Sequence, residues 1–559
     1  MNAAFLAAIV FVAFALGYRF YSAFLSRRLF AIQPDEPMPS KEFEDGVDYV
    51  PTRLHVLWGH HFASIAGAAP IVGPAIAVIW GWAPALLWVC VGTIFMGATH
   101  DFSALVISMR HQGQSIGEIS GQVINPRVRT LFLMIISLLI WVVLAVFAYI
   151  IGTLFVSTPS SIFPINFQIL VALFLGWLVY RRGIPMFIPS LFAYAALLVA
   201  IFYGEAFANA FPVIQTIPVI GWVWALLIYS FIASVLPVWL LLQPRDYLNS
   251  HQLVTGLVVL SLGLFVLRPE VVAPVIQLNP EGAPSLIPFL FVTIACGAIS
   301  GFHGLVSSGT TSKQLAQATD ARPIGYGAML GEGLLGLLAV LAATAGFSSG
   351  EEWSTHYASW GAANGLAAKL DAFVSGGATF VASLGIDREV ARTFMAVMVI
   401  AFAATSLDTS ARIQRLVISE LAEAYGVRSL RNRFLAGAVG IGAALLLATT
   451  QGGGTGGLAL WPLFGTTNQL VASVTLLVVS IWLKRQGRPI AYTAIPMVAL
   501  ALTTAWAMAG NLQHYYADFE SLWLLALSGT AVMGLDLWIL LEGGRLLLKP
   551  ASVQPPDRP

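Results

Sequence analysis

The sequence predicts an all-α polytopic membrane protein with about 15 transmembrane helices. Three observations lead to this class. Charged residues are only 10% of the 559 residues, against about 25% in a typical soluble domain. Apolar residues make up 58% of the chain, and they gather in stretches that approach the length of a membrane span. The formal net charge of +1 gives no reason to expect a nucleic-acid partner.

A membrane-spanning helix needs about 20 mainly apolar residues. The predicted spans are 2–18, 55–80, 82–109, 130–155, 166–180, 183–203, 218–243, 250–267, 287–311, 324–346, 389–408, 434–450, 457–483, 490–509 and 520–543. We interpret the first as a retained span, because its first basic residue, Arg19, follows the apolar stretch. The weaker, Gly-rich stretch 371–385 is expected in an external loop.

The distribution of basic residues gives the direction of the chain. With the N-terminus outside, all but four of the 28 Lys and Arg residues fall on the inner side; the exceptions are Arg268, Lys369, Arg388 and Arg392. Cytoplasmic loops carry the excess of Lys and Arg. The N-terminus is therefore expected outside and the C-terminus inside.

Two of the spans contain helix breakers. Segment 55–80 includes Gly67, Pro70, Gly73 and Pro74, and segment 287–311 is rich in Gly and hydroxyl residues. As the second and ninth spans they run in opposite directions. Two interrupted helices in corresponding places are typical of an inverted-repeat transporter with a central binding site. The alternative is that the glycines only allow close helix packing.

Residues around these breaks are the candidates for binding substrate, because unwound backbone at membrane depth faces protein or a water-filled cavity. The amide side chains of Asn468 and Gln469, in the span 457–483, are candidates as well. The predicted substrate-binding set is Gly59, His60, His61, Ser64, Gly67, Gly301, His303, Ser307, Ser308, Asn468 and Gln469.

Ionisable residues inside membrane spans are candidates for ion coupling, since a charge in hydrocarbon is expensive. They form three groups: the adjacent pair His100 and Asp101; Glu332; and Asp408 with Thr405, Ser406 and Thr409. The last group suits Na⁺ or a proton. Alternatively, His100 and Asp101 reach water at a helix end, and Asp408 pairs with Arg412 four residues later.

No cofactor is required by this interpretation, apart from H⁺ or Na⁺ as coupling ion. No resident metal is predicted, although His60, His61 and His303 offer imidazole ligands for a metal or haem. The sequence shows no nucleophile elbow or HExxH motif, so we expect no enzyme activity.

Five runs carry a family resemblance: Asp45–Thr52, Leu57–Pro74, Gly92–Phe102, Thr405–Thr409 and Trp461–Leu470. They closely resemble the carbon starvation protein A family of bacterial inner-membrane transporters over about residues 45–485. The resemblance implies peptide uptake as a response to carbon starvation, and some relatives are proton-coupled pyruvate symporters. It also implies the APC/LeuT-like fold, with a 5+5 inverted repeat.

The predicted organisation has three parts: an N-terminal helix and acidic segment, 1–54; a transporter core, 55–485; and peripheral helices, 486–559. Within the core, repeat one covers about 55–203, inserted helices 218–267 and repeat two about 287–483. The predicted function is secondary active import of short peptides across the inner membrane, coupled to protons, by alternating access. The alternatives are a proton-coupled pyruvate symporter, a haem- or metal-binding membrane protein, and a channel. The expected partners are a small-molecule substrate and the lipid bilayer.

Overall fold

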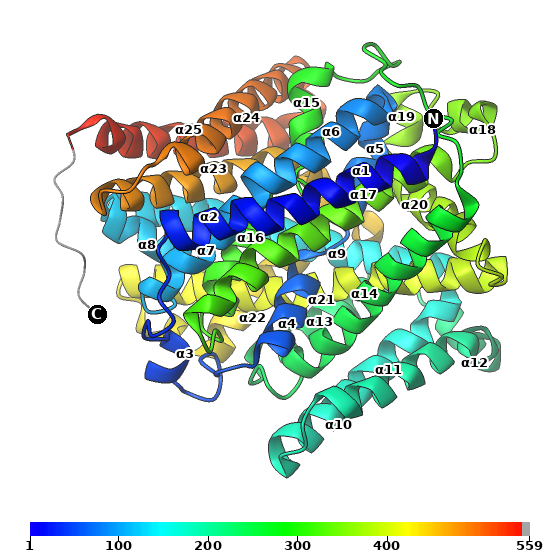
Figure 1. Cartoon of the computed structure of the whole chain (residues 1–559), viewed down its shortest axis with the longest axis horizontal. Helices are drawn as coiled ribbons and strands as arrows, with labels where there is room; N and C mark the ends of the chain where they lie inside the picture. The colour runs from blue at the N-terminus through cyan, green and yellow to red at the C-terminus, as the bar shows by residue number, and fades with distance from the viewer. Residues whose placement is uncertain (551–559) are drawn as a thin grey trace.

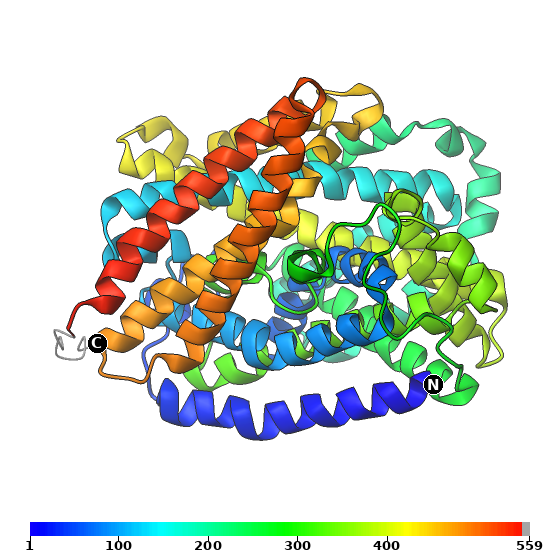
Figure 2. The ribbon, with the colours of Figure 1, turned by 90° about the horizontal axis from the view of Figure 1, so that it is seen from above.

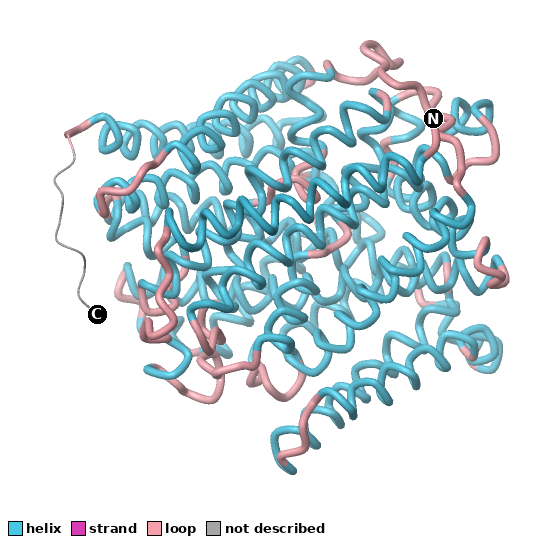
Figure 3. Tube along the Cα trace, in the orientation of Figure 1, coloured by secondary structure: helices cyan, strands magenta, loops and turns pink. Residues whose placement is uncertain are grey.

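The structure is a computed structural model that describes residues 1–550. The described residues form helices joined by loops, with two isolated β-bridges and no β-strand. Most helices run in roughly the same direction across the molecule (Figure 1), and most loops lie at the two ends of the bundle (Figure 3). The N-terminus and the end of α25 lie at opposite ends of it (Figures 1 and 2).

Ten helical segments are long and apolar enough to cross a membrane, or up to 12 if each of two bent pairs is one span. The ten are Ala3–Leu29, Trp82–Arg110, Pro126–Ser157, Pro159–Arg182, Leu242–Leu267, Ala318–Ala345, Arg388–Ala424, Gly452–Arg485, Ala491–Ala517 and Phe519–Leu548. The bent pairs are Leu54–Ile65 with Ala69–Trp80, and Phe187–Phe202 with Gly204–Ala210.

The predicted number of about 15 spans is not confirmed, although every predicted span contains helical residues. Helices α13 (Val219–Val235) and α22 (Arg433–Thr449) have 17 residues each, which is short for a bilayer of about 30 Å. Segment 287–311 divides into α15 (Leu286–Thr293) and α16 (Gly301–Val306).

The prediction of an external loop at 371–385 is wrong. Residues 366–382 form helix α20 (Leu366–Ala382). It packs against α5 (Ala69–Ala77), α14 (Leu242–Leu267), α17 (Ala328–Ala345) and α21 (Arg388–Ala424). Its glycines permit this packing: a Cβ added at Gly376 would collide with the carbonyl of Ala342 in α17.

Helix ends follow local capping signals. The Asn125 side chain accepts a hydrogen bond from the Val128 amide at the start of α9 (Pro126–Ser157), with Pro126 in the first position. Asp387 and Asn432 cap α21 (Arg388–Ala424) and α22 in the same way. Such caps satisfy backbone donors that have no partner within the helix.

The centre of the bundle is formed by α4, α7, α16, α17, α21 and α23. Helix α21 packs against α9, α13, α20 and α22, and α4 (Leu54–Ile65) packs against α14 (Leu242–Leu267). Around this centre, α24 (Ala491–Ala517) and α25 (Phe519–Leu548) cover one side and α1 (Ala3–Leu16) lies along another (Figure 2). Helices α10 (Ile162–Arg182), α11 (Phe187–Phe202) and α12 (Gly204–Ala210) form an outer layer (Figure 1).

Candidate functional site

The first predicted break is present between α4 and α5 (Ala69–Ala77). Helix α4 ends at Ile65, and Ala66 leaves the helical conformation with ψ 68°. Pro70 stands in the first turn of α5, where a missing N–H is tolerated. The axes of the two segments differ by 46°.

The second predicted break is an unwound segment between Thr293 and Gly301, the end of α15 and the start of α16. Gly297 in this segment has φ +91°, a conformation that side chains rarely adopt. Its carbonyl accepts a hydrogen bond from Thr93 Oγ1 at 3.0 Å, and its amide donates to Glu332 Oε1 at 3.2 Å. Side chains from two neighbouring helices therefore hold the unwound backbone.

The two breaks lie side by side with their chains antiparallel. Helix α15 packs against α5, while α16 packs against α4. The N-terminal half of each broken helix therefore packs against the C-terminal half of the other. A Cβ built at Gly297 would lie 3.5 Å from the Pro70 side chain, so the second unwound segment also contacts the start of α5.

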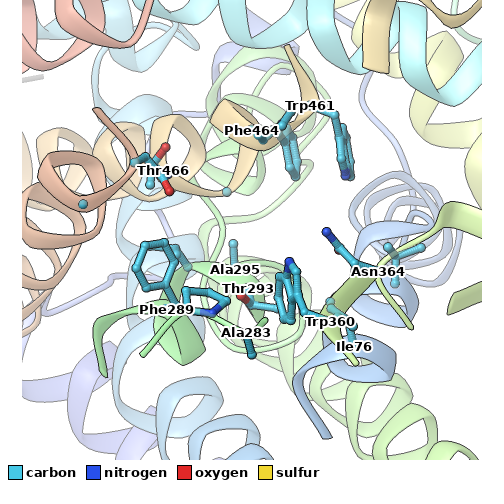
Figure 4. A pocket seen from close by; sticks show the side chains of 18 of the residues that line it. Ile76, Ala283, Phe289, Thr293, Ala295, Trp360, Asn364, Trp461, Phe464 and Thr466 are labelled. Carbon is cyan, nitrogen blue, oxygen red and sulfur yellow. The ribbon is translucent and has the colours of Figure 1, made fainter. Parts of the chain in front are cut away.

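A cavity of about 820 Å³ reaches the second break. Its lining comes from α5, α15, the segment around α19 (Trp360–Ala363), α20, α23 (Trp461–Arg485) and the α24–α25 region. Figure 4 shows Trp461 and Phe464 of α23 across the cavity from Phe289 and Trp360. Trp461 and Phe464 stack with ring centroids 4.4 Å apart.

None of the predicted substrate-binding residues lines this cavity. The glycines Gly59, Gly67 and Gly301 instead allow close approach of helices: an added Cβ would meet Ser250, Ser406 and the Asn468 carbonyl, respectively. The packing interpretation of these glycines is therefore the one that their surroundings favour.

The predicted polar residues are buried and mostly hydrogen-bonded within the protein. Their partners are as follows: Ser64 with Thr409 Oγ1 at 3.0 Å, His61 with Thr311 Oγ1 at 2.8 Å, Ser308 with the Gly304 carbonyl at 2.7 Å, Asn468 with the Phe302 amide at 2.9 Å, and Gln469 with Thr504 Oγ1 at 3.2 Å. The Ser307 hydroxyl has no partner among the described residues.

Three of the residues predicted for ion coupling and one predicted for substrate binding form one buried group, the Asp101 cluster: His100 and Asp101 of α7 (Ala98–Arg110), Glu332 of α17 (Ala328–Ala345) and, from the substrate-binding set, His303 of α16. Each side chain is fully buried. The Asp101 carboxylate contacts His100 Nδ1 at 2.7 Å and His303 Nδ1 at 2.9 Å. His303 Nε2 lies 3.0 Å from Glu332 Oε2.

The idea that His100 and Asp101 reach water at a helix end is therefore wrong. Glu332 does not line the cavity: its Oε2 lies 3.0 Å from His303 Nε2, and its Oε1 accepts a hydrogen bond from the Gly297 amide. Cys296 connects the cavity to this cluster. It lines the cavity, and it precedes Gly297, whose amide bonds to Glu332.

A second buried group, the Arg245 cluster, joins the predicted residues His60 and Asp408 to Arg245, Asp246 and Tyr229, which were not predicted as site residues. Arg245 and Asp246 lie in the first turn of α14, and Arg245 contacts Asp246 at 3.0 Å, Tyr229 at 2.8 Å and the Asp408 carboxylate. His60 Nδ1 contacts Asp246 at 2.6 Å. The sequence signal was an Arg–Asp pair in a connection of only six residues, 244–249, between two predicted spans.

Asp408 is therefore paired with Arg245 and not with Arg412, which corrects that alternative. The hydroxyls near Asp408 connect helices: Asn249 donates to Thr405, Ser406 donates to the Ser64 carbonyl at 3.0 Å, and Thr409 contacts Ser64. This arrangement does not gather oxygen ligands around a cation.

Arg412 and Arg415 of α21 contact Asp48, which lies in the loop before α4. Burial tends to raise the pKa of Asp48, but Arg412, Arg415 and Lys313 outweigh it and hold the pKa well below its ordinary value of 3.8. This contact ties the acidic N-terminal segment to the end of α21.

Three donor atoms, from Cys296, His303 and Glu332, lie within 4.8 Å of one another. Their residue types could hold a metal ion. His60 and His61 lie outside this group, bonded to Asp246 and Thr311. The Cys296 thiol is also used in the fold, since it donates to Ser300 Oγ at 3.2 Å.

Comparison with known proteins identifies the family to which the chain belongs. A family described as "Carbon starvation protein CstA" matches residues 2–351 and 349–507. The chain belongs to this carbon starvation family. The pyruvate/proton symporter BtsT of Escherichia coli strain K12 is 32% identical over 92% of this chain and 82% of its own length. The peptide transporter CstA of Bacillus subtilis is 31% identical over 92% of this chain and 91% of its own length.

A solved structure has the same general fold. A manganese transporter of Eremococcus coleocola superposes with a TM-score of 0.50 and 12% sequence identity, covering 90% of this chain and 99% of its own. The named relatives are transporters, and the family member described here is a multi-pass membrane protein with many apolar helices.

Proposed function

We propose that the chain is a secondary active transporter that imports short peptides across the bacterial inner membrane, as a response to carbon starvation. The observation that carries the proposal is the antiparallel contact of two interrupted helices beside a cavity of about 820 Å³. Transporters of this architecture bind substrate near such breaks. The cavity volume is in the range of about 300–1,000 Å³ that suits small-molecule ligands.

The proposed architecture is a 5+5 inverted repeat within residues 55–485. Repeat one covers about 55–203 and repeat two about 287–483, with inserted helices at 218–267. Support comes from the reversed pairing of α4 with α16 and α5 with α15. The proposed peripheral parts are residues 1–54 and 486–559, of which 551–559 lie outside the described residues; the outer positions of α1, α24 and α25 support this division (Figure 2).

The proposed orientation has the N-terminus outside and the C-terminus inside. The cavity lining includes residues 282–285, Trp360 and Asn364, which belong to connections before α15 and before α20 that the charge distribution assigns to the outside. In this orientation the cavity opens outward, and transport requires a second conformation that opens it inward.

The proposed coupling ion is the proton, held in the Asp101 cluster. If His303 donates its Nδ1 proton to Asp101, the opposite nitrogen faces the Glu332 carboxylate at 3.0 Å. That contact is attractive only when a proton lies on His303 Nε2 or on Glu332. Because Glu332 also accepts from the Gly297 amide in the break, protonation is linked to the backbone beside the cavity.

Na⁺ coupling at Asp408 has less support. The Asp408 carboxylate is already in contact with Arg245, Tyr229 and Ser230. A bound cation there would have to displace the Arg245 guanidinium or share the carboxylate with it.

A second candidate substrate is pyruvate, carried with a proton. Two observations favour it: the relative named pyruvate/proton symporter, and a cavity lining without Asp or Glu. The ammonium group of a peptide would find no carboxylate partner there, whereas pyruvate needs none.

The test is uptake into proteoliposomes under an imposed proton gradient, with labelled dipeptide and labelled pyruvate in separate assays. We expect Glu332→Gln to abolish accumulation against a gradient but to retain exchange of substrate, because the amide cannot take up and release the proton. Glu351→Gln, at an exposed residue of α18 (Gly350–His356), is the matched control. Unchanged accumulation in Glu332→Gln would refute the proton site, and no transport of either substrate would refute the function.

A further inference from the structure

The cavity contains one formally charged side chain. Among its lining residues, all of which the structure describes, Lys369 is the one Lys, Arg, Asp or Glu. The rest of the lining is aromatic, aliphatic or neutral polar, with Asn364 and Asn511 as amides and His514 as the one imidazole. The formal charge of the cavity wall is therefore positive.

The Lys369 ammonium group has no partner in the part of the chain that the structure describes. Its side chain is 8% exposed, and it makes no hydrogen bond or ion pair with any described residue. An isolated buried ammonium group is expensive unless an anion accompanies it. Its place in the first turn of α20 adds to this cost, because the N-terminus of a helix repels cations.

One long helix begins at the cavity without a side-chain cap. The cap residue of α20 is Gly365, which supplies no side-chain hydrogen bond. The residue that follows it, Leu366, lines the cavity. By contrast, α9 and α21 are capped by Asn125 and Asp387. Uncapped N-termini attract anions through their free amides and the helix dipole.

We propose that Lys369 binds the carboxylate group of the transported substrate in this cavity. The inference rests on the proposed transport function and names the chemistry of its ligand: a small organic carboxylate. Trp360, Trp461 and Phe464 enclose the organic part, since their rings face the cavity (Figure 4). Pyruvate and the C-terminus of a short peptide share this carboxylate.

The test is equilibrium binding to purified full-length protein in detergent, measured by calorimetry with pyruvate, with a dipeptide and with the same dipeptide amidated at its C-terminus. We expect Lys369→Gln to raise the Kd for the carboxylate ligand at least tenfold. Lys369→Arg keeps the charge and should retain most of the affinity. A merely structural lysine would not distinguish the free acid from the amide.

The matched control is Arg392→Gln. Arg392 lies on the same outer side, is half exposed and pairs with Asp371 at 3.0 Å, and it does not line the cavity. Its substitution should leave the Kd unchanged. Size-exclusion profiles of all variants establish that they are folded.

The outcomes separate this proposal from the proposed function. Unchanged affinity in folded Lys369→Gln, or equal affinity for acid and amide, overturns the role of Lys369. If proteoliposomes still accumulate the amidated dipeptide, transport stands and the carboxylate site falls. A preference for the free carboxylate that disappears in Lys369→Gln and is retained in Lys369→Arg supports the site. Whichever of pyruvate and the dipeptide has the lower Kd then identifies the source of the carboxylate.

Discussion

Arg245 is the cation around which one side of the protein core is organised. It contacts Asp246, Tyr229 and Asp408, and the two carboxylates and the guanidinium are almost fully buried. Removing one charge of a buried pair leaves the other uncompensated. We therefore expect Asp408→Asn to destabilise the protein by about 3 kcal/mol, measured by thermal unfolding in detergent.

The control for this prediction is Asp371→Asn. The Asp371–Arg392 pair has similar chemistry, but both side chains are about half exposed. Exposed ion pairs contribute less than about 1 kcal/mol. An Asp408→Asn variant as stable as Asp371→Asn would show that the buried pair contributes little.

The contacts of Asp48 lead us to expect that the stability of the protein depends on pH in the acid range. Its pKa in the folded protein is below the ordinary value of 3.8, because Arg412 and Arg415 outweigh the effect of burial. A lowered pKa gives stability that is present above the unfolded value and disappears as the pH falls through the folded one.

We expect Asp48→Asn to lower stability by about 2 kcal/mol at pH 7, the size typical of hydrogen bonds to charged groups. The gap between wild type and variant should narrow below about pH 4. Thermal unfolding over this pH range measures it, with the exposed Glu44→Gln as control. A gap of constant size would contradict the ion-pair explanation.

At the scale of residues, the sequence identified single ionisable groups but not their partners. Asp101 and Glu332 stood out because a charge inside a span is rare, and His303 stood out because it lies near a predicted helix break. Their contact depends on how α7, α16 and α17 pack, which sequence spacing does not contain. Arg245 was assigned to a loop, but α14 begins at Leu242 and tolerates Pro244 in its first turn.

At the scale of elements, interrupted helices were predictable because their causes are local. Proline lacks a backbone donor and glycine tolerates a positive φ, so Pro70 and Gly297 favour an interruption near their own positions. Helix α20 was not predictable in this way. Its stretch is Gly-rich and weakly apolar, and its helix is stabilised by packing on α5, α14, α17 and α21.

Gly301 tests the importance of the contact between α16 and α23. An added Cβ would collide with the Asn468 carbonyl and lie 2.6 Å from the Ala472 amide nitrogen. We expect Gly301→Ala to destabilise the protein by about 1–3 kcal/mol, the range for overpacked cores. Thermal unfolding in detergent provides the measurement.

The matched control is Gly442→Ala in α22, where an added Cβ has open space. Alanine is favoured over glycine in a helix by about 1 kcal/mol, so this variant should be slightly stabilised. Equal effects of the two substitutions would mean that helix propensity and not the contact decides stability.

At the scale of the whole molecule, composition was enough to predict a helical membrane protein, but not the number of spans. The length of an apolar stretch does not distinguish a complete span from a 17-residue helix such as α13 or from a broken pair such as α15 and α16. Only the packing of these elements distinguishes them. The family resemblance indicated a transport function, whereas the cavity that suggests the substrate chemistry was visible only in the structure.

The orientation of the molecule can be tested with two single cysteines. The only native cysteines, Cys90 and Cys296, are first replaced by serine. Asn364→Cys then places a thiol at the cavity mouth, and Ser429→Cys places one in the exposed connection between α21 and α22. The charge distribution assigns these positions to opposite sides of the membrane.

We expect a membrane-impermeant maleimide to label the Asn364→Cys variant in intact spheroplasts and the Ser429→Cys variant only after permeabilisation. Bound substrate should slow labelling at position 364, because Asn364 lines the cavity, and should leave position 429 unaffected. The reverse labelling pattern would place the cavity on the cytoplasmic side. In that case the same geometry would describe an inward-open transporter, and the first step of import would be sought in the conformation that closes this cavity.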